Sequence, residues 1–322
     1  VARVWNKSKA RKVLLSGTPM PHDPLDVFAQ YRALAPEVFG TRFGMFRQRI
    51  AIMGGFRSPY NGRPTQVVGW QNLDWLKERL SGTMFQPKPE DVELNLPPTK
   101  HVQVVVELEP KSRKLYDIVE SGIIAEMAAG EINPSNALVK LLRLQQLASG
   151  IAASEEVDDW GGTTKHVEII GTAKQDALAE IIDGTKDRVV VFCLFRAELD
   201  AIRKAAESAG AGCAEVSGRK DELAAWKDEE GGEITRVLAV QIAAGSEALD
   251  FTQAHHCAFM STGFNMGQYL QALKRCDRPG QKHPVTFYHL VAANTVDSRV
   301  YETLLKRGDL VKSALAGFPA PV

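Results

Sequence analysis

The chain has 322 residues, 44% of them hydrophobic, and this length and composition are typical of about two globular domains. Its 39 Lys and Arg residues balance 39 Asp and Glu residues, so the chain as a whole offers no bulk attraction to nucleic acid. No apolar run approaches the roughly 20 residues of a membrane span, and the N-terminus lacks the pattern of a signal peptide, so no membrane partner is predicted.

The charges and cysteines are unevenly placed along the chain. Residues 1–65 carry eleven Lys or Arg against three acidic residues, which favours a phosphate-facing surface in this first segment. The four cysteines lack Cys-x-x-Cys spacing, so neither a zinc site nor a disulfide framework is predicted and a reducing, cytoplasmic location is expected. The run His255–His256–Cys257 reads as sheet packing, because adjacent strand residues point to opposite faces and cannot all ligate one ion.

The first part of the chain has short local signals. Val13, Leu14 and Leu15 predict a short strand, which the Ser-Gly-Thr-Pro turn at residues 16–19 follows. Helical patterns occupy residues 24–34 and 73–80. Residues 44–69 are rich in Gly, Arg and aromatic residues without a clean period, and they predict an irregular insertion.

From residue 102 onward the pattern becomes that of an α/β domain. A strand is predicted over residues 102–108, a helix from Pro110, and a second helix where leucines recur after residue 136. The acidic, then Gly-rich stretch 154–164 marks a candidate boundary. Apolar strands separated by helical runs then predict a parallel sheet, with strands at 189–194, 213–216, 237–240, 256–260 and 285–289.

The stretch from Phe264 to Gln281, FNMGQYLQALKRCDRPGQ, predicts a helix that begins after Asn265 and stops before Pro279 and Gly280. Arg275 and Arg278 are three residues apart and share one helical face, which Gln271 also occupies. Two guanidinium groups at a helix end form a fork array suited to a triphosphate.

The pattern Q-x-x-x-R-x-x-R-x-G-Q of residues 271–281 resembles motif VI of the Swi/Snf-type ATPases, the DNA translocase branch of the superfamily-two helicases. Residues 16–19 are similar to motif III, and the run LPPTKHVQVVVELEPKSRKLYDIV is similar to the family's crossover segment. The run DRVVVFCLFRAELDAI resembles motif IV. Residues 244–250 resemble motif V with departures, since Ser246 and Ala248 replace two of its glycines.

The resemblance implies RecA-like helicase lobes: the end of lobe one with a helical insertion over 1–150, a linker over 151–172, and a complete parallel-sheet second lobe over 173–322. It also implies roles for individual residues. Arg278 would be an arginine finger, Arg275 a second phosphate contact or a brace, and Gln271 an orienting group. Gly245 and Asp250 would approach the nucleotide with the two arginines. Ser16, Gly17, Thr18 and Pro19 would couple the nucleotide site to the DNA path. The implied DNA contacts are Arg47, Arg49, Gly218, Arg219 and Gln241.

A motor of this kind uses ATP with Mg²⁺, yet neither G-x-x-x-x-G-K-[ST] nor an acidic pair followed by His at helicase spacing occurs in the sequence. We therefore expect the chain to act with a missing N-terminal half of lobe one, and to be inactive alone. The expected partner is double-stranded DNA, bound without sequence preference. Two alternatives stay open: a restriction-type helicase subunit, and a non-catalytic DNA-binding scaffold, which the altered motif V favours slightly.

Overall fold

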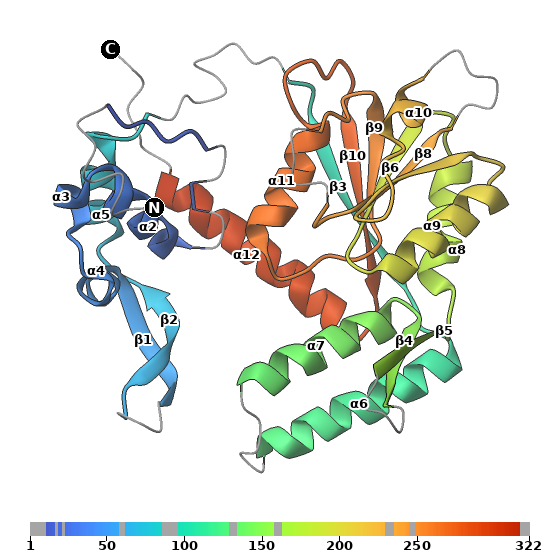
Figure 1. Cartoon of the computed structure of the whole chain (residues 1–322), viewed down its shortest axis with the longest axis horizontal. Coiled ribbons are helices and arrows are strands. Elements are labelled where there is room, and N and C mark those ends of the chain that lie inside the picture. The colour runs from blue at the N-terminus through green and yellow to red at the C-terminus, as the bar shows by residue number, and fades with distance from the viewer. Residues whose placement is uncertain are drawn as a thin grey trace. The chain divides into compact units, whose positions relative to one another are not determined.

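The computed structural model describes residues 11–16, 19–20, 23–57, 62–85, 96–128, 134–157, 163–228, 235–244 and 249–315 (Figure 1). The chain divides into two compact units. The first comprises Val1–Asn95 with two short segments, Asn265–Gly267 and Leu305–Val322. The second comprises Leu96–Phe264 and Gln268–Leu304.

The first unit is a small helical cluster with a β-hairpin. Its elements are the 3₁₀ turn η1 (Pro24–Asp26), α2 (Val27–Leu34), α3 (Pro36–Phe39), α4 (Phe43–Ile50), β1 (Ala51–Arg57), β2 (Pro64–Trp70) and α5 (Leu73–Ser81). Asp23 caps the first turn, because its carboxylate accepts the Leu25 N–H at 2.8 Å. An aromatic core holds the helices together, with Phe46 within 5.3 Å of Phe28 and 4.8 Å of Phe39, between ring centroids. The two predicted helices of this region are therefore present.

Two predictions for the first unit are wrong. Residues 44–69 are not irregular, because they contain α4 and the antiparallel β1–β2 pair, whose register shifts twice. Glycines at positions 54, 55 and 69 and these shifts interrupt the alternation that identifies a strand in sequence. Residues 13–15 form no strand: among the described residues no strand lies alongside them, and Leu15 is 93% exposed.

A six-stranded, entirely parallel sheet forms the centre of the second unit (Figure 1). Its order is β3-β10-β9-β6-β8-β7. The strands are β3 (Thr99–Val106), β6 (Arg188–Cys193), β7 (Cys213–Val216), β8 (Val237–Gln241), β9 (Ala254–Phe259) and β10 (Val285–Ala292). All six strands were predicted, to within three residues at each end. The sheet has the form of a RecA-like lobe, as the sequence implied.

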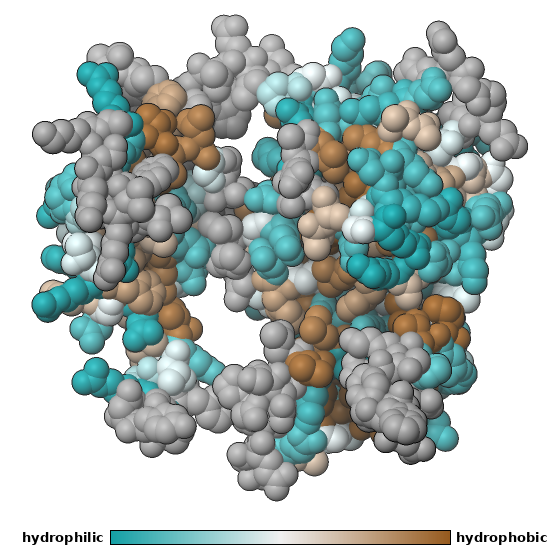
Figure 2. Space-filling model, in the orientation of Figure 1, coloured by the Kyte–Doolittle hydropathy of each residue, from teal (hydrophilic) through white to brown (hydrophobic). Residues whose placement is uncertain are grey.

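Helices cover both faces of this sheet. On one face α8 (Ala173–Asp183) and α9 (Arg196–Ser208) pack into an apolar core that includes Leu178, Ile202 and Val191. On the other face lie α10 (Leu223–Lys227) and α11 (Met266–Cys276), where the Tyr269 ring is 5.3 Å from that of Phe259. The helix α12 (Val296–Leu315) follows β10. The outer surface around α9 is mostly hydrophilic (Figure 2).

A helical pair and a hairpin connect β3 to α8. They are α6 (Pro110–Ala128), α7 (Pro134–Ala148), β4 (Ile151–Val157) and β5 (Thr163–Ile169). The predicted linker thus contains a regular antiparallel hairpin, with Ile151 opposite Ile169. Its polar, acidic residues obscured the strand pattern in sequence. Glu109 ties this region to the sheet, since its carboxylate accepts the N–H groups of Thr172 and Ala173 at the start of α8, at 2.5 and 2.9 Å. The division at residues 150 and 173 stays a prediction.

Candidate nucleotide-facing site

The two predicted arginines lie together at the end of α11: Arg275 is in its last turn, and Arg278 lies two residues beyond its end at Cys276. Nη1 of Arg275 and Nη1 of Arg278 both donate to the carbonyl oxygen of Leu249, at 3.2 and 3.4 Å. The backbone N–H of Phe251 in turn donates to the Arg275 carbonyl oxygen at 3.1 Å. The turn that ends this segment needs Gly280, whose φ of 105° is unfavourable for residues with a side chain. The two guanidinium groups therefore meet against the loop that precedes β9, although the helix ends before Arg278 and the two residues do not share a helical face as predicted.

The electrostatics of this pair favour an anion. Burial lowers the pKa of Arg275, and the neighbouring positive charge of Arg278 lowers it further. Burial by itself would raise the pKa of Asp250, but hydrogen bonds from Thr252 and the positive charges of Arg278 and Lys227 outweigh it, so the pKa falls. Asp250 is thus a carboxylate beside the pair. An incoming polyanion would relieve the repulsion between the two guanidinium groups.

The remaining predicted nucleotide-site residues are placed differently. Gln271 lies on the same helix and is exposed to solvent. Gly245 lies outside the described residues. Within the part of the chain that the structure describes, no group of three or more His, Cys, Asp and Glu residues could hold a metal ion. The described residues thus fit phosphate oxygens better than they fit Mg²⁺.

Gln281 holds this site in shape, and the sequence reasoning assigned it no role. It is 6% exposed, and its Nε2 lies within 3.1–3.2 Å of three carbonyl oxygens, those of Thr252, Ala254 and Cys276. Its Oε1 accepts the backbone N–H groups of Lys282 and His283, at 2.9 and 3.1 Å. One side chain therefore fastens the loop before β9 to the end of α11. The one feature of the sequence that could have indicated this role is the position of Gln281 at the end of the Q-x-x-x-R-x-x-R-x-G-Q motif.

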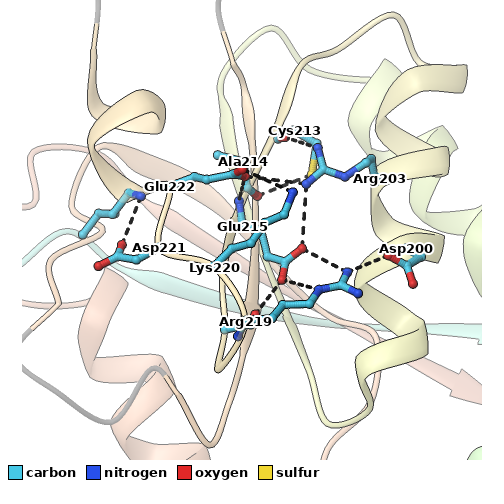
Figure 3. Close-up of polar contacts among 11 residues, drawn as sticks. Asp200, Arg203, Cys213, Ala214, Glu215, Arg219, Lys220, Asp221 and Glu222 are labelled. Atoms are coloured by element: carbon cyan, nitrogen blue, oxygen red, sulfur yellow. Dashed lines mark hydrogen bonds and ion pairs between the residues drawn. The ribbon is translucent and has the colours of Figure 1, made fainter.

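Of the three predicted DNA contacts in the second unit, Arg219 is engaged within the protein (Figure 3). Its Nε and Nη2 bind the two carboxylate oxygens of Glu215, at 2.8 and 3.1 Å, and Nη2 also binds Asp200 at 2.6 Å. Glu215 is 1% exposed. Burial would raise its pKa, but hydrogen bonds from Arg219 and Ser217 prevail and lower it. These pairings favour a structural role for Arg219 over a direct phosphate contact.

The other two lie near the carboxyl ends of β7 and β8: Gly218 is in the loop after β7, and Gln241 is the last residue of β8. The Nε2 amide of Gln241 donates to the Leu194 carbonyl oxygen at 3.2 Å, so this side chain links the ends of β6 and β8. A Cβ built at Gly218 would be in ordinary van der Waals contact with Nη2 of Arg196, at 3.8 Å.

The predicted residues of the first unit lie on α4 and before α2. Arg49 is exposed and its guanidinium lies 4.3 Å from the ring centroid of Trp75, whereas Arg47 is half-buried near Phe43. The carbonyl oxygen of Pro19 accepts a hydrogen bond from Gln30 at 2.6 Å. Ser16 is exposed, and Gly17 and Thr18 lie outside the described residues.

Comparison with known proteins defines the class. Residues 4–150 match the SNF2-related domain, and residues 173–280, which include both arginines, match the helicase conserved C-terminal domain. These two domains in this order are those of the SNF2-type helicase-like proteins. The chain therefore belongs to the Swi/Snf family, as its motifs implied.

Individual relatives agree with this assignment. The chain is 26% identical over 320 residues to the mouse DNA annealing helicase and endonuclease ZRANB3, covering 96% of this chain and 28% of that protein. It is 23% identical over 303 residues to the mouse SWI/SNF-related matrix-associated actin-dependent regulator of chromatin subfamily A member 1, covering 90% of this chain and 28% of that protein. The chain thus spans little more than a quarter of the length of these relatives.

A solved structure supports the fold. The C-terminal part of the Fun30 ATPase domain superimposes with a TM-score of 0.53 at 14% identity, covering 68% of this chain and 97% of that one. No helix among the described residues is long and apolar enough to cross a membrane.

Proposed function

We propose that this chain is part of an ATP-dependent DNA translocase, in which Arg275 and Arg278 contact the phosphates of ATP. The observation that carries the proposal is the pairing of the two guanidinium groups on the Leu249 carbonyl oxygen. Both side chains converge on this one acceptor, which places two positive charges at a single point of the loop before β9. The Swi/Snf family membership supports ATP as the ligand.

In this proposal each residue has a defined part. Arg278 donates to the γ-phosphate and stabilises the negative charge that develops there as the phosphoryl group is transferred. Arg275, which is partly buried and bonded to Leu249, supplies a second phosphate contact. Gln271, on the exposed face of α11, orients the phosphate. Asp250 keeps Arg278 directed toward the loop through its charge. Bound Mg²⁺ would neutralise phosphate charge, and its ligands would come from outside the described residues.

The sequence lacks the phosphate-binding loop pattern, so the loop and the acidic pair would be supplied by a missing N-terminal half of lobe one. We expect the 322-residue chain by itself to show no DNA-stimulated ATP hydrolysis above a buffer control. Robust turnover by the chain alone would contradict this part of the proposal.

The arginine roles can be tested in the complete motor with saturating DNA. Arg278→Ala should reduce ATP turnover by roughly 10³- to 10⁵-fold while ATP affinity stays within a few fold, because an arginine finger acts on the transition state. Arg278→Lys should rescue poorly, since an ammonium group cannot reproduce the planar fork. Lys274→Ala is the matched control, because Lys274 is an exposed cation on the same helix that pairs with Asp277. Near-wild-type turnover in Arg278→Ala would overturn the assignment and favour a non-catalytic DNA-binding scaffold.

We further propose double-stranded DNA, bound without sequence preference, as the partner. Candidate contacts are the exposed Arg49, its neighbour Arg47, and the loops that carry Gly218 and Gln241. Phosphate contacts release counterions, so the affinity should fall steeply as salt rises from 50 to about 200 mM. A flat response would argue against this surface. Strand-separation assays would distinguish a translocase from a restriction-type helicase subunit. The four free thiols support the proposed cytoplasmic location.

A further inference from the structure

A cavity of about 610 Å³ lies at the amino-terminal edge of the parallel sheet, within the second unit. It follows the starts of four adjacent strands, β10, β9, β6 and β8, which lie side by side in the sheet (Figure 1). The residues that line it lie just before these strands or in their first residues, and they include Lys186, Asp187, Arg188, Arg236, His255 and Lys282. Neither arginine of the nucleotide-facing pair lines it.

The charge around this cavity is strongly positive. Four of the lining residues are Lys or Arg, namely Lys186, Arg188, Arg236 and Lys282, and one lining residue, Asp187, is acidic. This carboxylate lies 3.5 Å from Nδ1 of His255 and 3.6 Å from Nε2 of His256. Among the described lining residues, four cations thus face one carboxylate.

Arg188 holds a fixed positive charge at the cavity wall. Its Nη2 donates to the Asp228 carbonyl oxygen at 3.4 Å, and the guanidinium lies 5.1 Å from the ring centroid of Trp226, which fixes its position. Its Nη1 is buried and, among the described residues, has no hydrogen-bond partner. Since this nitrogen is shielded from solvent, the charge of the fixed guanidinium at the cavity wall is what would attract an anion.

We propose that this cavity binds a phosphate group of a small phosphorylated ligand. A concave site of several hundred Å³ with a fixed guanidinium fork, two ammonium groups and imidazole donors suits a compact, multiply charged oxyanion. Arg188 serves as the central ligand, with Lys186 and Lys282 closing around the anion. Arg236 contributes charge, since its Nη1 is held by the carbonyl oxygens of Ile182 and Thr185. Neither Arg275 nor Arg278 lines the cavity, although Gln281 borders both sites.

The test is calorimetric titration of the full chain with inorganic pyrophosphate at about 0.1 M salt, where we expect a Kd below about 1 mM. Lys282→Gln should weaken binding at least about fivefold, and Arg188→Gln at least about tenfold, because each removes a charge-assisted hydrogen bond. Lys204→Gln is the matched control, since Lys204 is an exposed cation on α9 that does not line the cavity. Arg188→Lys keeps the charge and loses the fork, so its affinity should fall between those of wild type and Arg188→Gln.

Circular dichroism and the melting temperature establish that each variant is folded. If Arg188→Gln does not fold, the affinity of Lys282→Gln tests the proposal. Absence of pyrophosphate binding, or equal weakening by Lys204→Gln, would overturn the proposal. So would loss of binding in Arg278→Ala with full binding in Lys282→Gln, because pyrophosphate would then occupy the arginine pair. A short DNA duplex, added as a competitor of pyrophosphate, distinguishes the source of the phosphate. If the duplex competes with pyrophosphate and Lys282→Gln abolishes this competition, the ligand is the nucleic-acid backbone. If the duplex does not compete, the ligand is a free phosphorylated molecule.

Discussion

Replacing Gln281 by Glu is the sharpest single test of how the nucleotide-facing site is held together. The substitution preserves size and shape, but it removes both amide N–H donors and places a carboxylate among the three carbonyl oxygens of Thr252, Ala254 and Cys276. The loop before β9 would then be repelled from the end of α11. The neighbouring backbone N–H groups of Lys282 and His283 would still find an acceptor.

The magnitude follows from the contacts. Two amide N–H groups serve three acceptors at 3.1–3.2 Å, and a net contribution of about 1 kcal/mol per hydrogen bond gives a loss of about 2 kcal/mol. Like-charge repulsion in a buried site adds to this, so we expect Gln281→Glu to lower the free energy of unfolding by at least about 3 kcal/mol. Gln281→Ala also loses the two accepted bonds, so at the same value per bond it should cost about 4 kcal/mol without introducing a charge.

The assay combines urea unfolding with amide hydrogen exchange of residues 249–254. Exchange at Phe251, whose N–H donates to the Arg275 carbonyl oxygen, should accelerate most. Gln271→Ala on the exposed face of α11 is the control, and it should change stability by less than about 0.5 kcal/mol. If Gln281→Glu unfolds at the wild-type urea concentration and exchanges at the wild-type rate, the loop is held by other contacts and the reasoning is refuted.

Two further outcomes are expected. Arg219→Ala should lower the free energy of unfolding by about 1–3 kcal/mol, since the buried Glu215 loses its bidentate partner while Arg219 is partly screened by solvent. Arg196→Ala, at an exposed arginine, is the control. A tenfold loss of DNA affinity at unchanged stability would instead identify Arg219 as a phosphate contact. Burial and the nearby His101 lower the pKa of His289 to about 3. Because the unfolded chain takes up this proton near pH 6.5 and the folded chain does not, stability present above that pH should fall by about 2 kcal/mol at pH 5. His289→Phe keeps an aromatic ring to stack against Phe259, whose ring centroid is 5.0 Å away, but it has no titrating group. Urea unfolding at pH 7.5 and pH 5 should therefore show a smaller loss of stability in this variant than in the wild type. An equal loss in the variant and the wild type would contradict the role of His289.

The parts of the fold that the sequence predicted are those with dense apolar runs. Strands β6, β7, β8, β9 and β10 are covered on both faces, so their sequences are almost continuously hydrophobic and stand out between helices. The hairpins β1–β2 and β4–β5 are only partly covered, and glycines or acidic residues break their alternation. Their pairing depends on partners that a local pattern does not reveal.

The site divides in the same way. The proximity of Arg275 and Arg278 could be predicted because they are three residues apart, but the helix ends at Cys276 and their common contact is the carbonyl oxygen of Leu249 in another loop. The contacts of Gln281 and the engagement of Arg219 by Glu215 and Asp200 arise from segments that only the tertiary fold brings together. The basic cavity was hidden for the same reason, because its cations are separated in sequence and meet only where four strands begin.

The position of β3 in the sheet has a consequence for biosynthesis. Thr99 pairs with Val285, so β3 forms the edge of a sheet whose adjacent strand, β10, is made only after the whole of residues 107–284. At a synthesis rate of about 5–20 residues per second, β3 waits roughly 10–40 s for its neighbour. During that time an apolar strand with unsatisfied backbone groups is accessible to other chains. The second unit should therefore fold late and depend on chaperones. A chain truncated before β10 should aggregate, because β3 then has no strand that connects it to the rest of the sheet.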